Sequence, residues 1–235
     1  MKLLLLFFLS ASISSKAFSQ ELKYEPWNLL LNQYVSKQGN ANYKALKKNT
    51  KLLNECTTYF KNHPFSKDWS LNEKKSYWVN LYNFYTIQLI VKHYPLKSIK
   101  EIKVENKNAW ELPMIPYENK LLTLNELENK IIRKESKDAR IHFLLNCASF
   151  SCPILLNKAI TSKDIEQQLN TACKTFLNDK KRNKISSEQL ELSALFSWYK
   201  EDFPNLIEFI QEYTEITLNK NAKINYLEYN WNLNE

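Results

Sequence analysis

The sequence predicts a helix-rich α+β single domain in which one central, buried helix packs on a small sheet. Apolar residues recur at helical spacing over most of the chain, and short alternating segments stand between the helices. No internal repeat, low-complexity segment or linker divides the chain. The 235 residues are 44% hydrophobic and 25% charged, which is typical of a globular protein with a sizeable core. We therefore expect a single domain over residues 20–235.

Three helices are predicted in the first part of the chain, and the third of them is predicted to lie at the centre of the fold. Apolar spacing predicts these helices over residues 26–36, 43–60 and 72–93. Gly39 ends the first helix, Asn72 with Glu73 caps the third, and Pro95 stops it. The third helix is apolar around nearly its whole circumference, so we expect it to be buried.

The rest of the chain alternates short strands with helices. Strands are expected over residues 100–104, 110–117, 140–147, 190–192 and 224–229. Further helices are expected over residues 124–134, 193–203 and 205–213, and after Thr161. The helix at 124–134 has the clearest start, because Thr123 and Glu126 form a capping box.

The N-terminus has the order of a secretory signal peptide. Lys2 precedes an apolar run at 3–9, and small or polar residues follow up to Gln20. The run is much shorter than the roughly 18 apolar residues of a membrane span. We therefore expect a signal peptide at 1–19, cleaved after Ser19, and a secreted or periplasmic mature chain with no transmembrane segment. An uncleaved membrane anchor is the alternative.

Composition also limits the partners. The formal charge is +8, but nearly all the basic residues are lysines spread along the chain, so we expect no nucleic-acid binding. Gly39 is the only glycine, which excludes the glycine-rich loops that bind phosphates and dinucleotides. We expect no cofactor, and the expected partner is an unknown envelope or extracellular ligand.

Glu128 is the first residue that does not fit its surroundings. It lies four residues after Leu124 and three before Ile131, on the apolar face of its helix. A buried carboxylate is costly unless a donor meets it. An arginine, a backbone amide or a tyrosine hydroxyl would give Glu128 a structural role. Orientation of a catalytic imidazole is the alternative.

A second group of candidates surrounds the helix at 72–93. Asn80 and Asn83 lie on one side of it, where their amides either brace neighbouring elements or donate to a developing oxyanion. Because this helix is apolar nearly all round, the segment at 140–147 and the Glu128 face must both pack against it. We therefore expect Glu128, His142 and Cys147 to converge on the Asn80 and Asn83 side.

The segment from His142 to Pro153 allows three interpretations. His142 and Cys147 could be the base and the nucleophile of an acyl-transfer site. Cys147 and Cys152 could instead close a small disulfide loop, which an oxidising compartment favours. His142 with both cysteines could bind a metal, but this spacing matches no common zinc pattern, and we expect no metal.

Several ordered motifs resemble one known family. They are YWVNLYN at 77–83, LTLNELE at 122–128, HFLLNCASFSCP at 142–153, LS at 192–193 with FSWYKEDF at 196–203, and YNWNLN at 229–234. Together they are similar, over about residues 42–234, to the domain-of-unknown-function family 547. The resemblance implies an α+β domain, secreted or envelope-attached in bacteria, with no established activity. The family commonly has histidine where Asn129 stands and aspartate where Asn230 stands; a catalytic role for that histidine would leave this member impaired.

Two classes of function follow. We first expect a binding or structural module that contains a buried Glu, His, Cys and Asn network. The alternative is a thiol-dependent hydrolase or acyl transferase acting on an amide or ester in the cell envelope. In that enzyme Cys147 is the nucleophile, His142 the base and Glu128 the group that holds the imidazole, while Asn80 or Asn83 polarises the substrate carbonyl.

Overall fold

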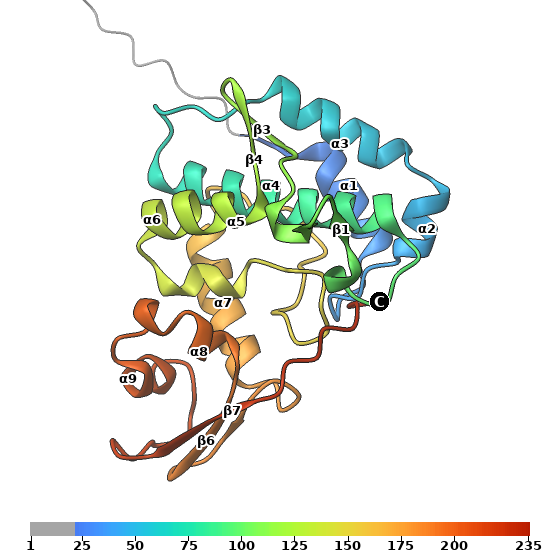
Figure 1. Ribbon diagram of the computed structural model, residues 1–235. Helices are drawn as coiled ribbons and strands as arrows, with labels where there is room; N and C mark the ends of the chain where they lie inside the picture. The colour runs from blue at the N-terminus through green and yellow to red at the C-terminus, as the bar shows by residue number, and fades with distance from the viewer. Residues whose placement is uncertain (1–21) are drawn as a thin grey trace, which may run out of the picture.

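The computed structural model describes residues 22–235, so the signal peptide expected at 1–19 lies outside the described residues. Helices make up the body of the molecule, and a three-stranded sheet stands at one end of it beside α8 and α9 (Figure 1). The α-helices are α1 (Glu25–Tyr34), α2 (Tyr43–Lys48), α3 (Lys51–Asn62), α4 (Leu71–His93), α5 (Leu124–Glu126), α6 (Arg133–Ser136), α7 (Ile165–Leu177), α8 (Leu195–Trp198) and α9 (Leu206–Gln211).

The strands are short and form three small sheets. Two of these are hairpins, and the third combines an antiparallel and a parallel pair. They are β1 (Lys103–Val104) with β2 (Lys107–Asn108), β3 (Ile115–Tyr117) with β4 (Lys120–Leu122), and β5 (Lys184–Ile185), β6 (Gln189–Ser193) and β7 (Lys223–Leu227) in the order β5-β6-β7. The predicted helix-rich α+β class is confirmed.

Helix α4 is the centre of the core. Nearly all of its residues are buried, among them Trp78, Tyr82 and Phe84. Its neighbours in the fold are helices, including α2, α3 and α7, whereas the three-stranded sheet lies at the far end of the molecule (Figure 1). The sheet that we expected under this helix is therefore replaced by a shell of helices, which can cover an element that is apolar on every side.

Two details of the predicted helices are wrong. Ser70, and not Asn72, caps α4: the Ser70 hydroxyl accepts from the Glu73 amide at 3.3 Å, and the Glu73 carboxylate accepts from the Ser70 amide at 2.7 Å. The single helix expected at 43–60 is broken into α2 and α3. Asn49 is extended at the break and its side chain accepts from the Lys51 amide at 3.3 Å, which gives the backbone an alternative to the helix.

The strand expected at 140–147 is also wrong. Residues Ala139–Phe143 form a 3-10 helix, which the Asp138 side chain caps by accepting from the Arg140 amide at 3.0 Å. Successive side chains at Ile141, His142 and Phe143 are all buried, so burial does not alternate along the segment as it would in a half-exposed strand. Alternation in the sequence therefore predicted a strand where local capping produces a turn of helix.

A cluster of ion pairs joins this segment to α4 and α7. The buried Lys75 ammonium lies 3.1 Å from Asp138 and 3.3 Å from Glu166, and Arg140 binds the same two carboxylates at 2.7 and 2.8 Å. Burial raises the pKa of Asp138, but the hydrogen bonds and charges of Arg140 and Lys75 outweigh it and the net shift is downward.

The C-terminal part of the chain is less helical than predicted. The helix expected at 193–203 is split into α8 and a 3-10 turn at Lys200–Asp202, and the strands expected near 100–104 and 110–117 are shorter and partly 3-10 helical. The strands at 190–192 and 224–229 correspond to β6 and β7. After β7 the chain returns along the loop at 146–153, where the Phe150 amide donates to the Asn232 carbonyl at 2.7 Å.

Candidate functional site

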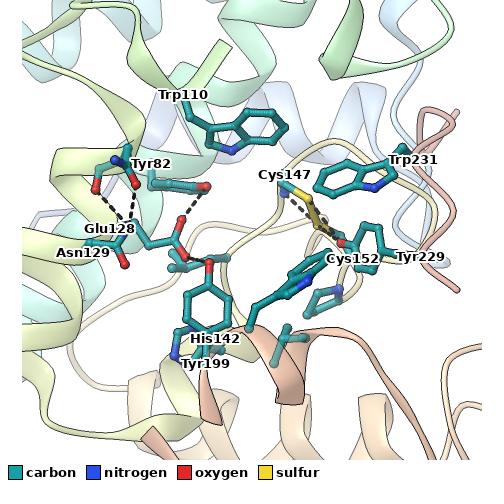
Figure 2. Close-up of a pocket in the computed structure, with 15 residues that line it drawn as sticks. Tyr82, Trp110, Glu128, Asn129, His142, Cys147, Cys152, Tyr199, Tyr229 and Trp231 are labelled. Atoms are coloured by element: carbon teal, nitrogen blue, oxygen red, sulfur yellow. Dashed lines mark hydrogen bonds between the residues drawn. A yellow bond between two sulfur atoms is a disulfide. The ribbon is translucent and has the colours of Figure 1, made fainter. Parts of the chain in front are cut away.

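A cleft of about 260 Å³ opens where the helix at 124–136, the loop at 146–153, α8 and the C-terminal tail meet (Figure 2). Aromatic rings make up most of its walls. The aromatic residues that line it are Tyr82, Trp110, Trp198, Tyr199, Tyr229 and Trp231. The other lining residues are Asn125, Glu128, Asn129, His142, Leu145, Cys147, Cys152, Pro153 and Leu195.

Three of the rings come from the C-terminal part of the chain and pack on one another. Trp198 and Trp231 are stacked, with centroids 5.6 Å apart and an angle of 23° between their planes. Tyr229 lies 4.6 Å from Trp231 and 4.7 Å from Trp198. Trp110 meets the edge of this group, 5.6 Å from Trp231. Half of the Trp198 surface remains exposed, so the rings form an open wall rather than a closed core.

Glu128 supplies the charge in this cleft. Its side chain reaches between two tyrosines (Figure 2): Tyr82 donates to one carboxylate oxygen at 2.9 Å, and Tyr199 donates to the other at 2.5 Å. Burial, and then the charge of Glu128, raises the pKa of both tyrosines, so their hydroxyls stay protonated and donate. The predicted inward orientation of Glu128 is confirmed, with tyrosine hydroxyls as its partners and not His142.

The local helix geometry contributes to this arrangement. Glu128 stands in a π-helical turn, Leu127–Ile132, between α5 and α6, and the predicted capping box of Thr123 and Glu126 begins the helix. Such turns widen a helix locally and are frequent at functional sites. The side chain of the neighbouring Asn129 accepts from Arg133 at 2.7 Å.

We expect Glu128→Ala to lower the free energy of unfolding by roughly 1–3 kcal/mol, because two buried hydroxyls lose their acceptor. The measurement is the midpoint of urea denaturation, with unfolding monitored by circular dichroism. Glu201→Ala, at an exposed position, is the matched control and should leave the midpoint unchanged. Equal midpoints for wild type and Glu128→Ala would show that the carboxylate is not needed by the tyrosines.

His142, at the wall of the cleft, belongs to a second polar group. Its Nε2 lies 2.7 Å from Asp202, and the guanidinium of Arg133 holds the same carboxylate through two hydrogen bonds of 2.6 and 2.9 Å. The imidazole packs on Tyr199, with ring centroids 4.0 Å apart. The hydrogen bond from His142, followed by that from Arg133, holds the pKa of Asp202 well below its usual range.

This shift predicts how stability depends on pH. The pKa of Asp202 is lower in the folded chain than the usual value of about 3.9 in an unfolded one, so its contribution is complete near neutral pH and is lost as the pH falls. Asp202→Asn should therefore flatten the decline in the urea midpoint between about pH 5 and pH 3. A decline as steep as that of wild type would contradict the role given to Asp202.

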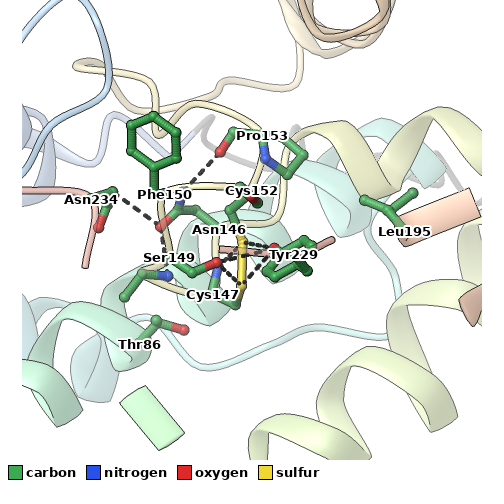
Figure 3. Close-up of a disulfide and its surroundings, with 12 residues drawn as sticks. Thr86, Asn146, Cys147, Ser149, Phe150, Cys152, Pro153, Leu195, Tyr229 and Asn234 are labelled. Atoms are coloured by element: carbon green, nitrogen blue, oxygen red, sulfur yellow. Dashed lines mark hydrogen bonds between the residues drawn. A yellow bond between two sulfur atoms is a disulfide. The ribbon is translucent and has the colours of Figure 1, made fainter. Parts of the chain in front are cut away.

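Cys147 and Cys152 form a disulfide at the other side of the cleft (Figure 3), with their Cα atoms 6.3 Å apart. Tyr229 donates to the Cys152 sulfur at 3.1 Å, and Ser149 lies 3.2 Å from the Cys147 sulfur. A nucleophilic cysteine must be a free thiolate. With the disulfide closed, the structure holds neither the thiol nor the His142–Cys147 hydrogen bond that the enzyme interpretation requires.

The two remaining cysteines of the described chain are buried in the core. Burial raises the pKa of the Cys56 thiol to about 12 and also raises that of Cys173. Both residues pack on the apolar faces predicted for α3 and α7. They are structural residues, because a buried thiol with a raised pKa is unreactive.

Asn80 and Asn83 act as braces. Asn80 accepts from the Trp27 indole at 3.1 Å and donates to the Ile160 carbonyl at 2.7 Å. Asn83 donates to the Leu144 carbonyl at 2.9 Å and accepts from the Asn146 amide at 2.8 Å. Both amides are buried and neither lines the cleft, so the structure does not place them where they could polarise a substrate.

The structure therefore brings Glu128, His142 and Cys147 to the walls of one cleft. Asn80 and Asn83 lie outside this cleft and donate to backbone carbonyls of neighbouring segments. Sequence reasoning assigned no site role to Tyr199, Asp202, Tyr229 or Trp231. These residues lie in the motifs at 196–203 and 229–234, so the signal was present. The sequence does not indicate that the C-terminal tail packs against the loop at 146–153, as it does in the structure.

Within residues 22–235, no three His, Cys, Asp or Glu side chains lie close enough together to hold a metal ion. None of the helices in the same part of the chain combines the length and apolar character of a membrane span. Comparison with curated proteins and with solved structures finds no match. Residues 66–177, which include α4, Glu128, His142 and the disulfide, match the family described as "Protein of unknown function, DUF547", and this match supports the family that the sequence motifs indicated.

Proposed function

We propose that this chain is a secreted or periplasmic binding protein that holds a small ligand in the cleft between Glu128 and the tryptophan wall. The observation that carries the proposal is the convergence of aromatic rings from four separate parts of the chain around one buried carboxylate. Binding sites combine a mostly apolar concave wall with a few well-placed polar groups. The cleft has this composition.

The walls of the cleft are held rigidly, as a binding site requires. The disulfide fixes the loop that carries Ser149, and the Ser149 hydroxyl in turn lies 3.0 Å from the Tyr229 hydroxyl. On the opposite side, His142 and Arg133 hold Asp202 and with it the segment of Tyr199. Rigid support lowers the entropy lost when a ligand binds.

A larger cavity of about 610 Å³ lies between the α3–α4 connection and the β3–β4 hairpin. It also has aromatic walls, formed in part by Phe65 and Tyr117. Its charged lining residues Lys61, Lys67 and Glu118 are all exposed, and Lys67 and Glu118 pair with each other at 3.3 Å. Among the described residues it therefore has no buried charged group like Glu128. The cleft around Glu128 is therefore the better candidate.

Tryptophan fluorescence and thermal shift test this proposal. The probes are choline, 3,3-dimethyl-1-butanol, N-acetylglucosamine and L-phenylalanine, titrated into the mature protein. We expect saturable binding of at least one probe, weakened about tenfold or more by Trp198→Leu because a half-exposed wall ring is removed. Trp69→Leu, outside the cleft, should bind as wild type does. Binding that survives Trp198→Leu, or no binding of any probe, would contradict the proposal.

The thiol-enzyme alternative has a separate test. Intact-mass measurement after thiol labelling of the native protein should show Cys147 and Cys152 unmodified, because both sulfurs are in the disulfide. Labelling of Cys147 at neutral pH that is lost in His142→Ala would instead favour the enzyme.

The compartment is tested at the N-terminus of exported protein. From the order of charged, apolar and small residues at 1–19, we expect the mature chain to begin at or near Gln20. Sequencing that returned Met1 would contradict this part of the proposal.

A further inference from the structure

We infer that the ligand of this cleft is an organic cation, an ammonium group with small alkyl substituents, bound between Glu128 and the faces of the tryptophan rings. This inference rests on the proposed function, namely that the cleft binds a ligand. It adds the chemical class of that ligand, and its test separates the two.

The first support is the charge of the site. The direct partners of Glu128 are two neutral phenol hydroxyls, and no lysine, arginine or histidine within residues 22–235 forms an ion pair with it. The nearby guanidinium of Arg133 is held by both oxygens of Asp202 and by Asn129. A buried carboxylate without a direct counter-ion is costly, and a bound cation is the ligand that offsets this cost.

The second support is the nature of the walls. Aromatic faces attract cations through the ring quadrupole, and cages of such rings bind quaternary ammonium groups. Two rings of this cleft already do so with side chains: the Lys100 ammonium lies 5.3 Å from the centroid of Trp231, and the Arg133 guanidinium lies 5.1 Å from that of Tyr199. Rings of this cleft therefore already attract cations, which is the property that an alkylammonium ligand requires.

The third support comes from the polar groups that a sugar would need. A polyol is recognised by several directed hydrogen bonds, because its hydroxyls must be paired when they lose water. The Asn129 amide is engaged with Asn125 and Arg133, and the His142 imidazole is engaged with Asp202. Among the lining residues that the structure describes, Glu128 is the one carboxylate or basic side chain other than His142 that faces the cavity in Figure 2. One charge within aromatic walls suits an alkylammonium better than a polyol.

The size of the cleft agrees with this class. Its volume of about 260 Å³ is below the roughly 300–1,000 Å³ of pockets that take drug-sized ligands. It admits a small molecule, or one cationic group of a larger molecule whose remainder stays in solvent at the open side near Trp198.

The experiment compares choline with 3,3-dimethyl-1-butanol, which has the same shape but carbon in place of the charged nitrogen. Both are titrated into the mature protein by isothermal calorimetry and tryptophan fluorescence. We expect choline to bind at least tenfold more tightly than the neutral alcohol. Glu128→Gln keeps an acceptor for the tyrosines but removes the charge, and should abolish this preference. Glu201→Gln, which removes an exposed charge outside the cleft, should retain it.

Each outcome separates the inference from the proposed function. Equal affinity for choline and the alcohol, or a preference that survives Glu128→Gln, would show that the cleft binds ligands but not because they are cations. Binding of N-acetylglucosamine or L-phenylalanine without choline would also refute the cation and leave the binding function in place. Absence of binding by every probe would refute both. The comparison in wild type needs no variant, so it stands even if Glu128→Gln does not fold.

Discussion

Asp138→Ala is expected to lower the free energy of unfolding by about 3 kcal/mol, at the lower end of the range for breaking buried ion pairs. The substitution removes one of the two carboxylates that the buried Lys75 ammonium and the Arg140 guanidinium share. Glu166 still accepts from both cations, which is why the loss is not larger. Asp138 also caps the 3-10 helix that carries His142, so the same change loosens one wall of the cleft.

Urea denaturation followed by circular dichroism measures this loss. Asp68→Ala, at an exposed position, is the matched control and should change the stability by no more than about 0.5 kcal/mol. A change at Asp138 as small as that of the control would show that Glu166 alone satisfies the two cations.

The double substitution Cys147→Ser with Cys152→Ser should both destabilise the fold and weaken ligand binding. Closing so short a loop removes chain entropy worth about 2 kcal/mol from the unfolded state. The sulfur of Cys152 also accepts from Tyr229, which forms part of the tryptophan wall. We therefore expect the affinity of the cleft for its ligand to fall as well.

A reductant provides the control for this prediction. Dithiothreitol should lower the urea midpoint and the ligand affinity of wild type towards those of the double variant, and should leave the double variant unchanged. Loss of stability in the variant without any effect of dithiothreitol on wild type would point to packing of the sulfurs rather than to the bond between them.

The parts of the fold that the sequence predicts best are those decided by local rules. The central position of α4 follows from apolar residues on every side, and the inward position of Glu128 follows from its spacing to Leu124 and Ile131. The capping box of Thr123 and Glu126 is present as expected. These features depend on residues within one or two helical turns.

The features that could not be predicted depend on contacts between distant residues. The segment around His142 has strand-like alternation in its sequence, but Asp138 caps it as a 3-10 helix and Ile141, His142 and Phe143 are buried in succession. The tail reaches the loop at 146–153 through contacts such as the Ser151 amide with the Asn230 carbonyl at 3.2 Å. It also reaches Gly39, whose carbonyl accepts from the Asn234 side-chain amide at 3.0 Å across a sequence separation of 195 residues. Because these long-range contacts cannot be inferred from the sequence, the sequence could not predict that Tyr229 and Trp231 line the same cleft as Glu128.

The most direct test of a ligand-binding cleft is fluorine NMR of protein labelled with 5-fluorotryptophan. The chain has six tryptophans, and only Trp110, Trp198 and Trp231 line the cleft. Single Trp→Phe variants assign the resonances, and choline is then added to saturation. We expect the resonances of these three residues to shift along one binding curve while those of Trp27, Trp69 and Trp78 stay in place. Shifts confined to the latter three, or no shift with choline or any of the neutral probes, would contradict a ligand site between Glu128 and the tryptophan wall.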